Sequence, residues 1–273
     1  MKPHAEPTLE SAWIAACLHL FDQPGREQHH LVFEIMHPCA QPQQWQMGLR
    51  DGLDKFLKKN TKGEWQPVHT VAETIFPAGL YEQYGTDGVY EIYPNEVYPA
   101  IKGSHWGRYA YLLVRRLDSK GKVALDDGVP INPLRRCIDR MNRQLTQKSN
   151  NRVIYEMDFV EDLAGELQFT RMSRREPNPA NGPCLSHLSM KFSSDRKLHL
   201  AAIYRSHFYA QKALGNLLGL SRLMAFVCEQ TGLEPGRLLC VSTHARLEFP
   251  NYVKDLKQFK ALLEKFNQER LSP

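Results

Sequence analysis

The chain has 273 residues, of which 42% are hydrophobic and 24% charged, so it can bury a core and is not disordered throughout. Its net charge of +5 is spread along the sequence, which suits an anionic small ligand such as a phosphate and argues against a nucleic-acid surface. Six cysteines are scattered without a CxxC pair or zinc-type Cys/His spacing, so neither a metal site nor a disulfide scaffold is expected.

The first apolar stretch, residues 12–21, predicts an amphipathic helix. It is too short to span a bilayer, and Glu6 and Glu10 stand where a secretory signal would carry basic residues. We therefore expect a protein of the reducing cytoplasm that does not contact a membrane.

A strand over 31–36 and a helix over 47–59 follow. A short helix over 71–76 ends at Pro77, and a loop rich in Tyr, Gly and Pro is expected up to about Lys102. Its tyrosines either shape a site or pack against the core.

The pattern becomes regular from Pro133 onward. Apolar residues at helical spacing are followed by strand-like and helical segments, with a polar excursion at 161–180. Gly232 stands where the longest of these helices needs a C-terminal cap. The predicted segments are a helix from 134 to 147, strands at 152–159, 185–192 and 198–204, a helix at 216–231, a strand at 237–242, and a helix at 253–270. This order predicts an α+β protein.

Several motifs in this half occur in a fixed order. Pro183-Cys184 opens one strand, Arg205-Ser206 follows the next, Asn216 comes eleven positions after Arg205, and Thr243-His244 follows a later strand. Thymidylate synthases have the same ordered set, with a long helix after the Asn. The chain is thus similar to the thymidylate synthase and pyrimidine hydroxymethylase superfamily, as a divergent member. The resemblance is clearest over 130–245, thin over 70–110 and not visible over 1–60.

The resemblance implies a single domain over 1–273 with a mixed sheet packed against helices. It also implies a homodimer whose substrate is a pyrimidine nucleoside monophosphate, dUMP or UMP. The reaction would be methyl or hydroxymethyl transfer to C5 of the uracil base. A cysteine thiolate adds to C6 in such a reaction and makes C5 nucleophilic.

Each implied site residue has a side chain suited to its role. Cys184 would be the nucleophile, and a neighbouring cation would favour its thiolate. The remaining roles are proton transfer by Glu73, phosphate binding by Arg205 and Ser206, phosphate binding across the dimer by Arg152, base recognition by Asn216, sugar binding by His244, and substrate binding by Trp106 in a segment similar to the family's Tyr-Gly segment. The residues alone leave other readings open, such as a buried hydrophobic Cys184, a helix-capping Asn216 and a solvated Glu73.

The chain also departs from the family pattern. Phe208 stands where the family has an Asp used in folate binding, Leu185 replaces a His, and Tyr204 replaces a Gln. Arg246 replaces a Tyr that contacts the sugar, and we find no counterpart of the tail that closes over folate. Each lost charge-assisted hydrogen bond removes about 1.5–3 kcal/mol of binding, so the cofactor 5,10-methylenetetrahydrofolate is in doubt.

Three functions remain open. The first is the C5 transferase, for which Asn216 favours uracil over cytosine. The second is a nucleotide-binding homologue that acts as a sensor or complex subunit. The third is a structural or interaction protein whose sheet only looks similar.

Overall fold

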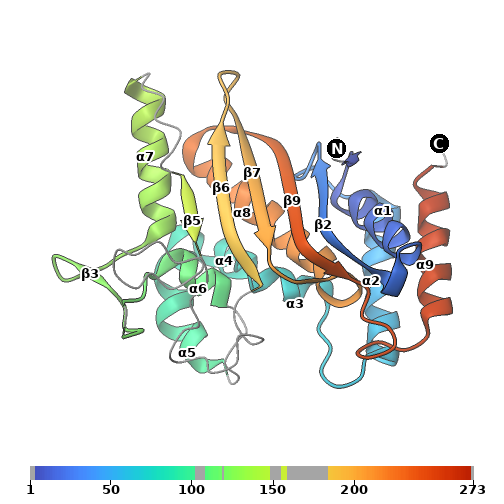
Figure 1. The fold of residues 1–273 in the computed structure, drawn as a ribbon. Helices are drawn as coiled ribbons and strands as arrows, with labels where there is room; N and C mark the ends of the chain where they lie inside the picture. The colour runs from blue at the N-terminus through green and yellow to red at the C-terminus, as the bar shows by residue number, and fades with distance from the viewer. Residues whose placement is uncertain (1–3, 102–107, 119, 148–154, 159–183, 272–273) are drawn as a thin grey trace.

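A computed structural model describes residues 4–101, 108–118, 120–147, 155–158 and 184–271. A seven-stranded mixed sheet forms the centre of the molecule, and its main path has the order β1-β2-β9-β7-β6-β5 (Figure 1). The sheet strands are β1 (His4–Glu6), β2 (Glu27–Ile35), β5 (Glu156–Asp158), β6 (Leu185–Phe192), β7 (Lys197–Tyr204), β8 (His207–Phe208) and β9 (Glu234–Arg246). The α+β prediction, with a mixed sheet packed against helices, is confirmed.

The direction of the strands changes across the sheet. β9 runs parallel to β7 and antiparallel to β2, and β6 runs antiparallel to β7. β8 adds a short parallel pairing with the end of β9. A small separate hairpin is formed by β3 (Leu125–Asp126) and β4 (Val129–Pro130).

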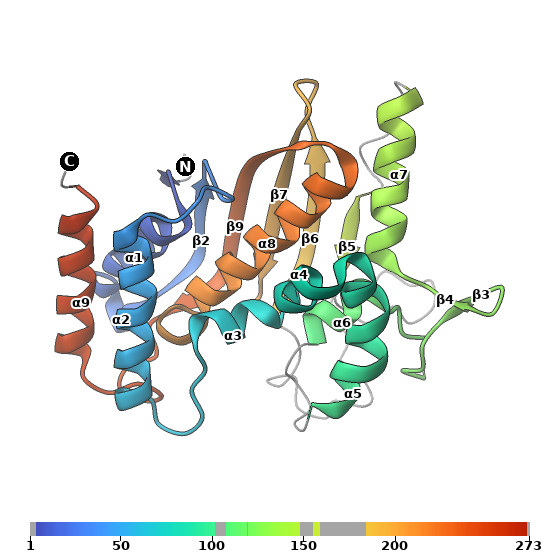
Figure 2. The same ribbon diagram turned by 180° about the vertical axis from the view of Figure 1, so that it is seen from behind.

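Helices cover one face of the sheet, with α8 (Leu214–Thr231) lying across β7 and β9 (Figure 2). Gly232 adopts a left-handed backbone (φ 65°) and ends α8, as predicted. The other helical segments are α1 (Leu9–Phe21), η1 (Pro24–Arg26), α2 (Gln44–Asn60), α3 (Val68–Glu73), α4 (Ala78–Asp87), η2 (Gly88–Val97), α5 (Tyr98–Ala100), α6 (Arg108–Val114), α7 (Pro133–Gln147), η5 (Tyr209–Ala213) and α9 (Leu256–Glu269). Among the described residues, no helix is both long and apolar enough to cross a lipid bilayer.

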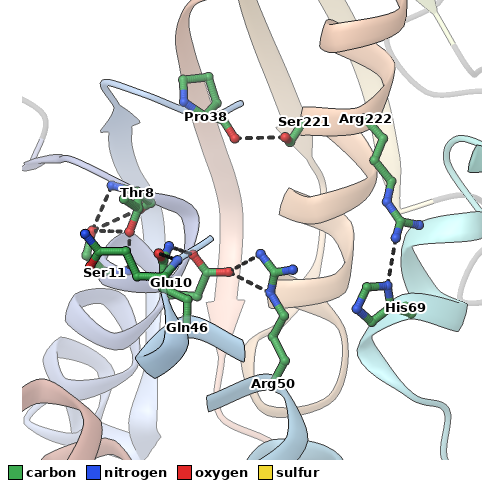
Figure 3. A network of polar contacts seen from close by, with 10 residues as sticks. Thr8, Glu10, Ser11, Pro38, Gln46, Arg50, His69, Ser221 and Arg222 are labelled. Atoms are coloured by element: carbon green, nitrogen blue, oxygen red, sulfur yellow. Dashed lines mark hydrogen bonds and ion pairs between the residues drawn. The ribbon is translucent and has the colours of Figure 1, made fainter. Parts of the chain in front are cut away.

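The prediction of an amphipathic first helix is wrong. α1 is buried on nearly all sides because it packs against β2, α8 and α9. Trp13 donates its indole N–H to the carbonyl of Tyr209 at 2.7 Å. The carboxylate of Glu10, also buried, accepts bonds from Gln46 Nε2 at 2.5 Å and Arg50 Nε at 2.8 Å, which join α1 to α2 (Figure 3). A pattern of apolar residues cannot predict such a buried ion pair.

The prediction of a loop after Pro77 is also wrong, because this segment forms α4, η2 and α5. Gly85, with φ 62°, allows the kink inside α4. Tyr81 and Tyr90 make edge-to-face contacts with Phe226 of α8, at centroid distances of 4.9 Å and 5.9 Å. Packing against the core is therefore the role of these two tyrosines.

Two glycines bring α8 unusually close to α3. A Cβ atom at Gly215 would lie 2.5 Å from Cβ of Val71, and one at Gly219 would lie 2.7 Å from the carbonyl oxygen of Ala72. Only glycine permits these approaches. These contacts fix the position of α8 relative to α3, and with it the position of Asn216 in the first turn of α8.

The predicted second-half elements are otherwise found, with shifted ends. β9 is longer than the predicted strand, and α9 begins at Leu256 instead of residue 253. Only 156–158 of the strand predicted over 152–159 is assigned as β5, and 152–154 and 159 lie outside the described residues. The polar excursion at 161–180 lies outside them as well.

Candidate active site

Cys184 immediately precedes β6, and its backbone is fixed from two sides. The hydroxyl of Tyr109 on α6 accepts the N–H of Cys184 at 2.8 Å and the N–H of Leu185 at 3.2 Å. The carbonyl of Cys184 accepts the N–H of Arg205 at 2.9 Å. The half-buried thiol therefore has a defined position at the end of the β6–β7 ladder.

Arg205 lies across from Cys184 in this ladder, next to the register pair Leu185 and Tyr204. Residues opposite one another in an antiparallel pair place their side chains on the same face. Burial raises the pKa of the Cys184 thiol, while positive charge on Arg205, Arg246 and Lys212 opposes that rise. The structure therefore brings Cys184 and Arg205 together, with two further cations. We call Arg205, Lys212 and Arg246 the cation cluster.

Lys212 belongs to η5, which follows β8. Burial lowers the pKa of its ammonium to about 8, and the nearby carboxyl of Glu248 opposes that shift. Glu248 is 3% exposed and accepts the N–H groups of Ala210 at 2.9 Å and Gln211 at 3.1 Å. Burial raises its own pKa to about 7. Glu248 thus holds the segment that carries Lys212 beside the thiol.

Asn216 belongs to a buried polar chain. Its Nδ2 lies 3.1 Å from Nε2 of His207, whose Nδ1 lies 2.9 Å from Oγ of Ser242. The same Oγ lies 2.9 Å from the hydroxyl of Tyr209. The ring of Tyr204 stacks on His207 at 4.0 Å and 9°. All of these side chains are buried. Tyr204 is the register partner of Leu185, the residue that follows Cys184, so this chain lies next to Cys184 in the β6–β7 ladder.

Two other predicted residues have partners outside the cation cluster. Glu73, on α3, accepts a bond from Arg222 of α8 at 2.8 Å. Burial raises the pKa of Glu73, and the charge of Arg222 opposes the rise. His244 lies 2.9 Å from Glu27 of β2 and stacks on His29 at 5.1 Å.

The remaining predicted residues are placed less fully. Ser206 is half-buried in the short connection from β7 to β8, next to Arg205. Arg152 and Trp106 lie outside the described residues, so their roles stay predictions.

The residue at the family's folate-binding position offers no carboxylate. Phe208 has the guanidinium of Arg246 over its ring at 4.4 Å and the ring of Tyr252 at 5.4 Å. An aromatic ring in such a stack cannot accept the charge-assisted hydrogen bonds that an Asp gives a pterin. In the described part of the chain, no three His, Cys, Asp or Glu side chains gather as metal ligands would.

Curated relatives share part of this sequence. A Methanosarcina mazei protein is 38% identical over 102 residues, which are 34% of this chain and 46% of that protein. A Methanosarcina acetivorans protein is 31% identical with the same coverage of both chains. A Methanopyrus kandleri protein is 32% identical over 117 residues, 43% of this chain and 54% of its own. All three are provisionally named thymidylate synthase.

The chain is a divergent, thymidylate synthase-like protein. It spans about half the length of the curated relatives that it matches. No protein-family model matches it. Both findings agree with the departures at Leu185, Tyr204, Phe208 and Arg246.

Sequence reasoning did not identify several residues of this candidate site. Arg246 was singled out only as a departure from the family pattern, and Tyr109, three residues after Trp106, was assigned no role. Lys212 and Glu248 carry no motif, and they come together because Glu248 accepts backbone N–H groups of η5. His207 is adjacent to the Arg205-Ser206 pair, which is a weak signal for a role in the site.

Proposed function

We propose that this protein binds a pyrimidine nucleoside monophosphate, dUMP or UMP, and transfers a methyl or hydroxymethyl group to C5 of the base through Cys184. The observation that carries the proposal is the cation cluster gathered around a half-buried thiol. Arg205 and Ser206 would bind the phosphate, and Asn216 would bind the edge of the uracil ring. Positive charge beside a thiol favours the thiolate, which is the nucleophilic form.

The chemistry begins with addition. The Cys184 sulfur forms a bond to C6, and the electron pair of the C5–C6 double bond moves to C5 and O4 as an enolate. A proton then adds to C5. Loss of the other C5 hydrogen as a proton and departure of the thiolate from C6 restore the base. This half-reaction exchanges the C5 hydrogen with water and needs no second substrate.

The one-carbon donor is a separate matter. Because Phe208 does not fit the family's contact with 5,10-methylenetetrahydrofolate, we derive no step through folate. That mismatch also favours a second candidate, a nucleotide-binding homologue that has lost transfer chemistry and acts as a sensor or complex subunit.

Glu73 is the carboxylate that we propose for proton transfer through water at the base. The bond from Arg222 would have to open or be bridged by water for this role. A Glu73→Gln variant that loses C5 exchange while keeping nucleotide affinity would support it, and full exchange in that variant would remove Glu73 from the mechanism.

We also propose a homodimer formed by the sheet face opposite α8, where no described helix lies (Figure 1). Half-buried apolar side chains form cross-strand neighbours there, with Val241 paired to both Val32 and Ile203. Such a patch is typical of a face covered by another chain. A Val241→Glu variant should sediment as a monomer if a second copy covers this face. A wild-type protein that sediments as a monomer at micromolar concentration would exclude it.

The decisive experiment is release of tritium from C5 of labelled dUMP and UMP. We expect release by the wild type and by Cys39→Ser, a control at another half-buried cysteine, and none by Cys184→Ala. Binding by calorimetry without exchange, and without a 5-fluoropyrimidine nucleotide adduct on Cys184, would favour the sensor. If the protein binds no pyrimidine nucleotide, the transferase and the sensor are both excluded, and a structural or interaction protein is the remaining function.

A further inference from the structure

The side-chain amide of Asn216 makes one hydrogen bond to another described residue, and that residue is His207. The amide nitrogen donates, so Nε2 of His207 must be the acceptor and carry no proton. A neutral imidazole then has its proton on Nδ1, which donates to Oγ of Ser242 at 2.9 Å. The Ser242 oxygen, which accepts that proton, also lies 2.9 Å from the Tyr209 hydroxyl, and either of these two hydroxyls can be the donor.

We propose that His207 is a specificity-determining residue that holds the Asn216 amide in the orientation that accepts uracil and rejects cytosine. This inference rests on the proposed function, because it concerns the base bound at the same site. With one N–H committed to His207, Asn216 keeps a carbonyl oxygen and one N–H. Uracil offers the matching edge, a donor at N3 and an acceptor at O4.

Cytosine offers the reverse edge, an acceptor at N3 and a donor amino group at C4. To match it, the amide of Asn216 must turn over, which would point its oxygen at Nε2 of His207. Two acceptors would then face each other in a buried site, a cost equivalent to about a 10-fold to 100-fold loss of affinity.

His207 cannot readily relieve that conflict. A change of tautomer would require the Ser242 hydroxyl to stop accepting the Nδ1 proton and to turn its own proton toward Nδ1. Protonation is also opposed, because complete burial lowers the pKa of His207 to about 3. The ring itself is held by its stack with Tyr204.

The test measures dissociation constants of dUMP and dCMP by calorimetry for the full chain. Ser242→Ala removes the acceptor of the Nδ1 proton, and Tyr209→Phe, a milder change, removes one partner of the Ser242 hydroxyl. Each should reduce the preference for dUMP about tenfold, mainly by strengthening dCMP binding. Ser221→Ala is the matched control, because Ser221 is a buried serine of α8 whose hydroxyl donates to the carbonyl of Pro38 at 2.8 Å (Figure 3). It should leave the preference unchanged.

Nitrogen NMR shifts of the His207 ring give a readout that loss of stability would not mimic. The wild type should show the Nδ1–H tautomer, and an Nε2–H tautomer would overturn the inference. An unchanged dUMP preference in both variants, with dUMP still bound, would overturn it as well while sparing the proposed function. If the wild type binds neither nucleotide, the proposed function fails and base selection falls with it.

Discussion

Replacing Glu248 by Gln should change how the stability of the protein depends on pH. Burial raises the pKa of this carboxyl from 4.5 to about 7 in the folded state. Between these values the folded state binds more protons than the unfolded state, so stability falls as pH rises. A difference of about 2.5 pH units at about 1.4 kcal/mol per unit gives about 3.5 kcal/mol. This contribution is complete below pH 4.5 and is lost as pH rises through about 7.

The assay is urea unfolding of wild type and Glu248→Gln at intervals from pH 4.5 to 7.5. The glutamine keeps only one of the two oxygens that accept the N–H groups of Ala210 and Gln211, which lowers stability at every pH, but it does not titrate. His207 is common to both proteins, so its opposite effect, stability lost as pH falls below 6.5, cancels in the comparison. Wild type should lose about 3 kcal/mol relative to the variant over this range. Parallel curves would show that Glu248 is not held protonated by burial.

Three further predictions concern the thiol, an unpartnered hydroxyl and a helix contact. The ratio of the alkylation rate by anionic iodoacetate to that by neutral iodoacetamide should be about tenfold higher at Cys184 than at Cys39, because the cation cluster attracts the anion. Peptide mass spectrometry measures both ratios, and equal ratios would refute this prediction. Tyr204→Phe should raise the free energy of unfolding by about 1 kcal/mol, since that hydroxyl is buried without a hydrogen-bond partner among the described residues; lower stability would reveal a bound water or ligand there. Gly219→Ala should cost about 2 kcal/mol or more, because its Cβ would lie 2.7 Å from a backbone carbonyl oxygen of α3. Its control is Gly79→Ala, where nothing lies within 4 Å, so matching stabilities would contradict the clash.

The sequence predicted the sheet and α8 because those segments have simple hydrophobic periods. β6 and β7 each bury alternate residues, and Gly232 marks the end of α8. The segment after Pro77 was mispredicted because its Tyr, Gly and Pro residues are typical of loops. Here the contacts of Tyr81 and Tyr90 with Phe226 override that local preference, and no local pattern reports such contacts.

The candidate site divides in the same way. The sequence could predict that Cys184 and Arg205 lie close together, because one hairpin carries both residues. Lys212 of η5 and Arg246 of β9 act on the thiol from separate segments whose meeting depends on the whole fold. His244 and Glu73 show the converse, since the family resemblance implied roles for them at the site and the structure gives them the partners Glu27 and Arg222.

The glycine contacts between α3 and α8 also bear on motion. Val71 and Ala72 lie against Gly215 and Gly219 without the spacing that larger side chains would provide. When the backbones of two helices touch in this way, neither helix can slide or tilt without moving the other. The carboxylate at the end of α3 and the amide at the start of α8 would therefore travel as one rigid piece, so a ligand that pulls on one must also reposition the other.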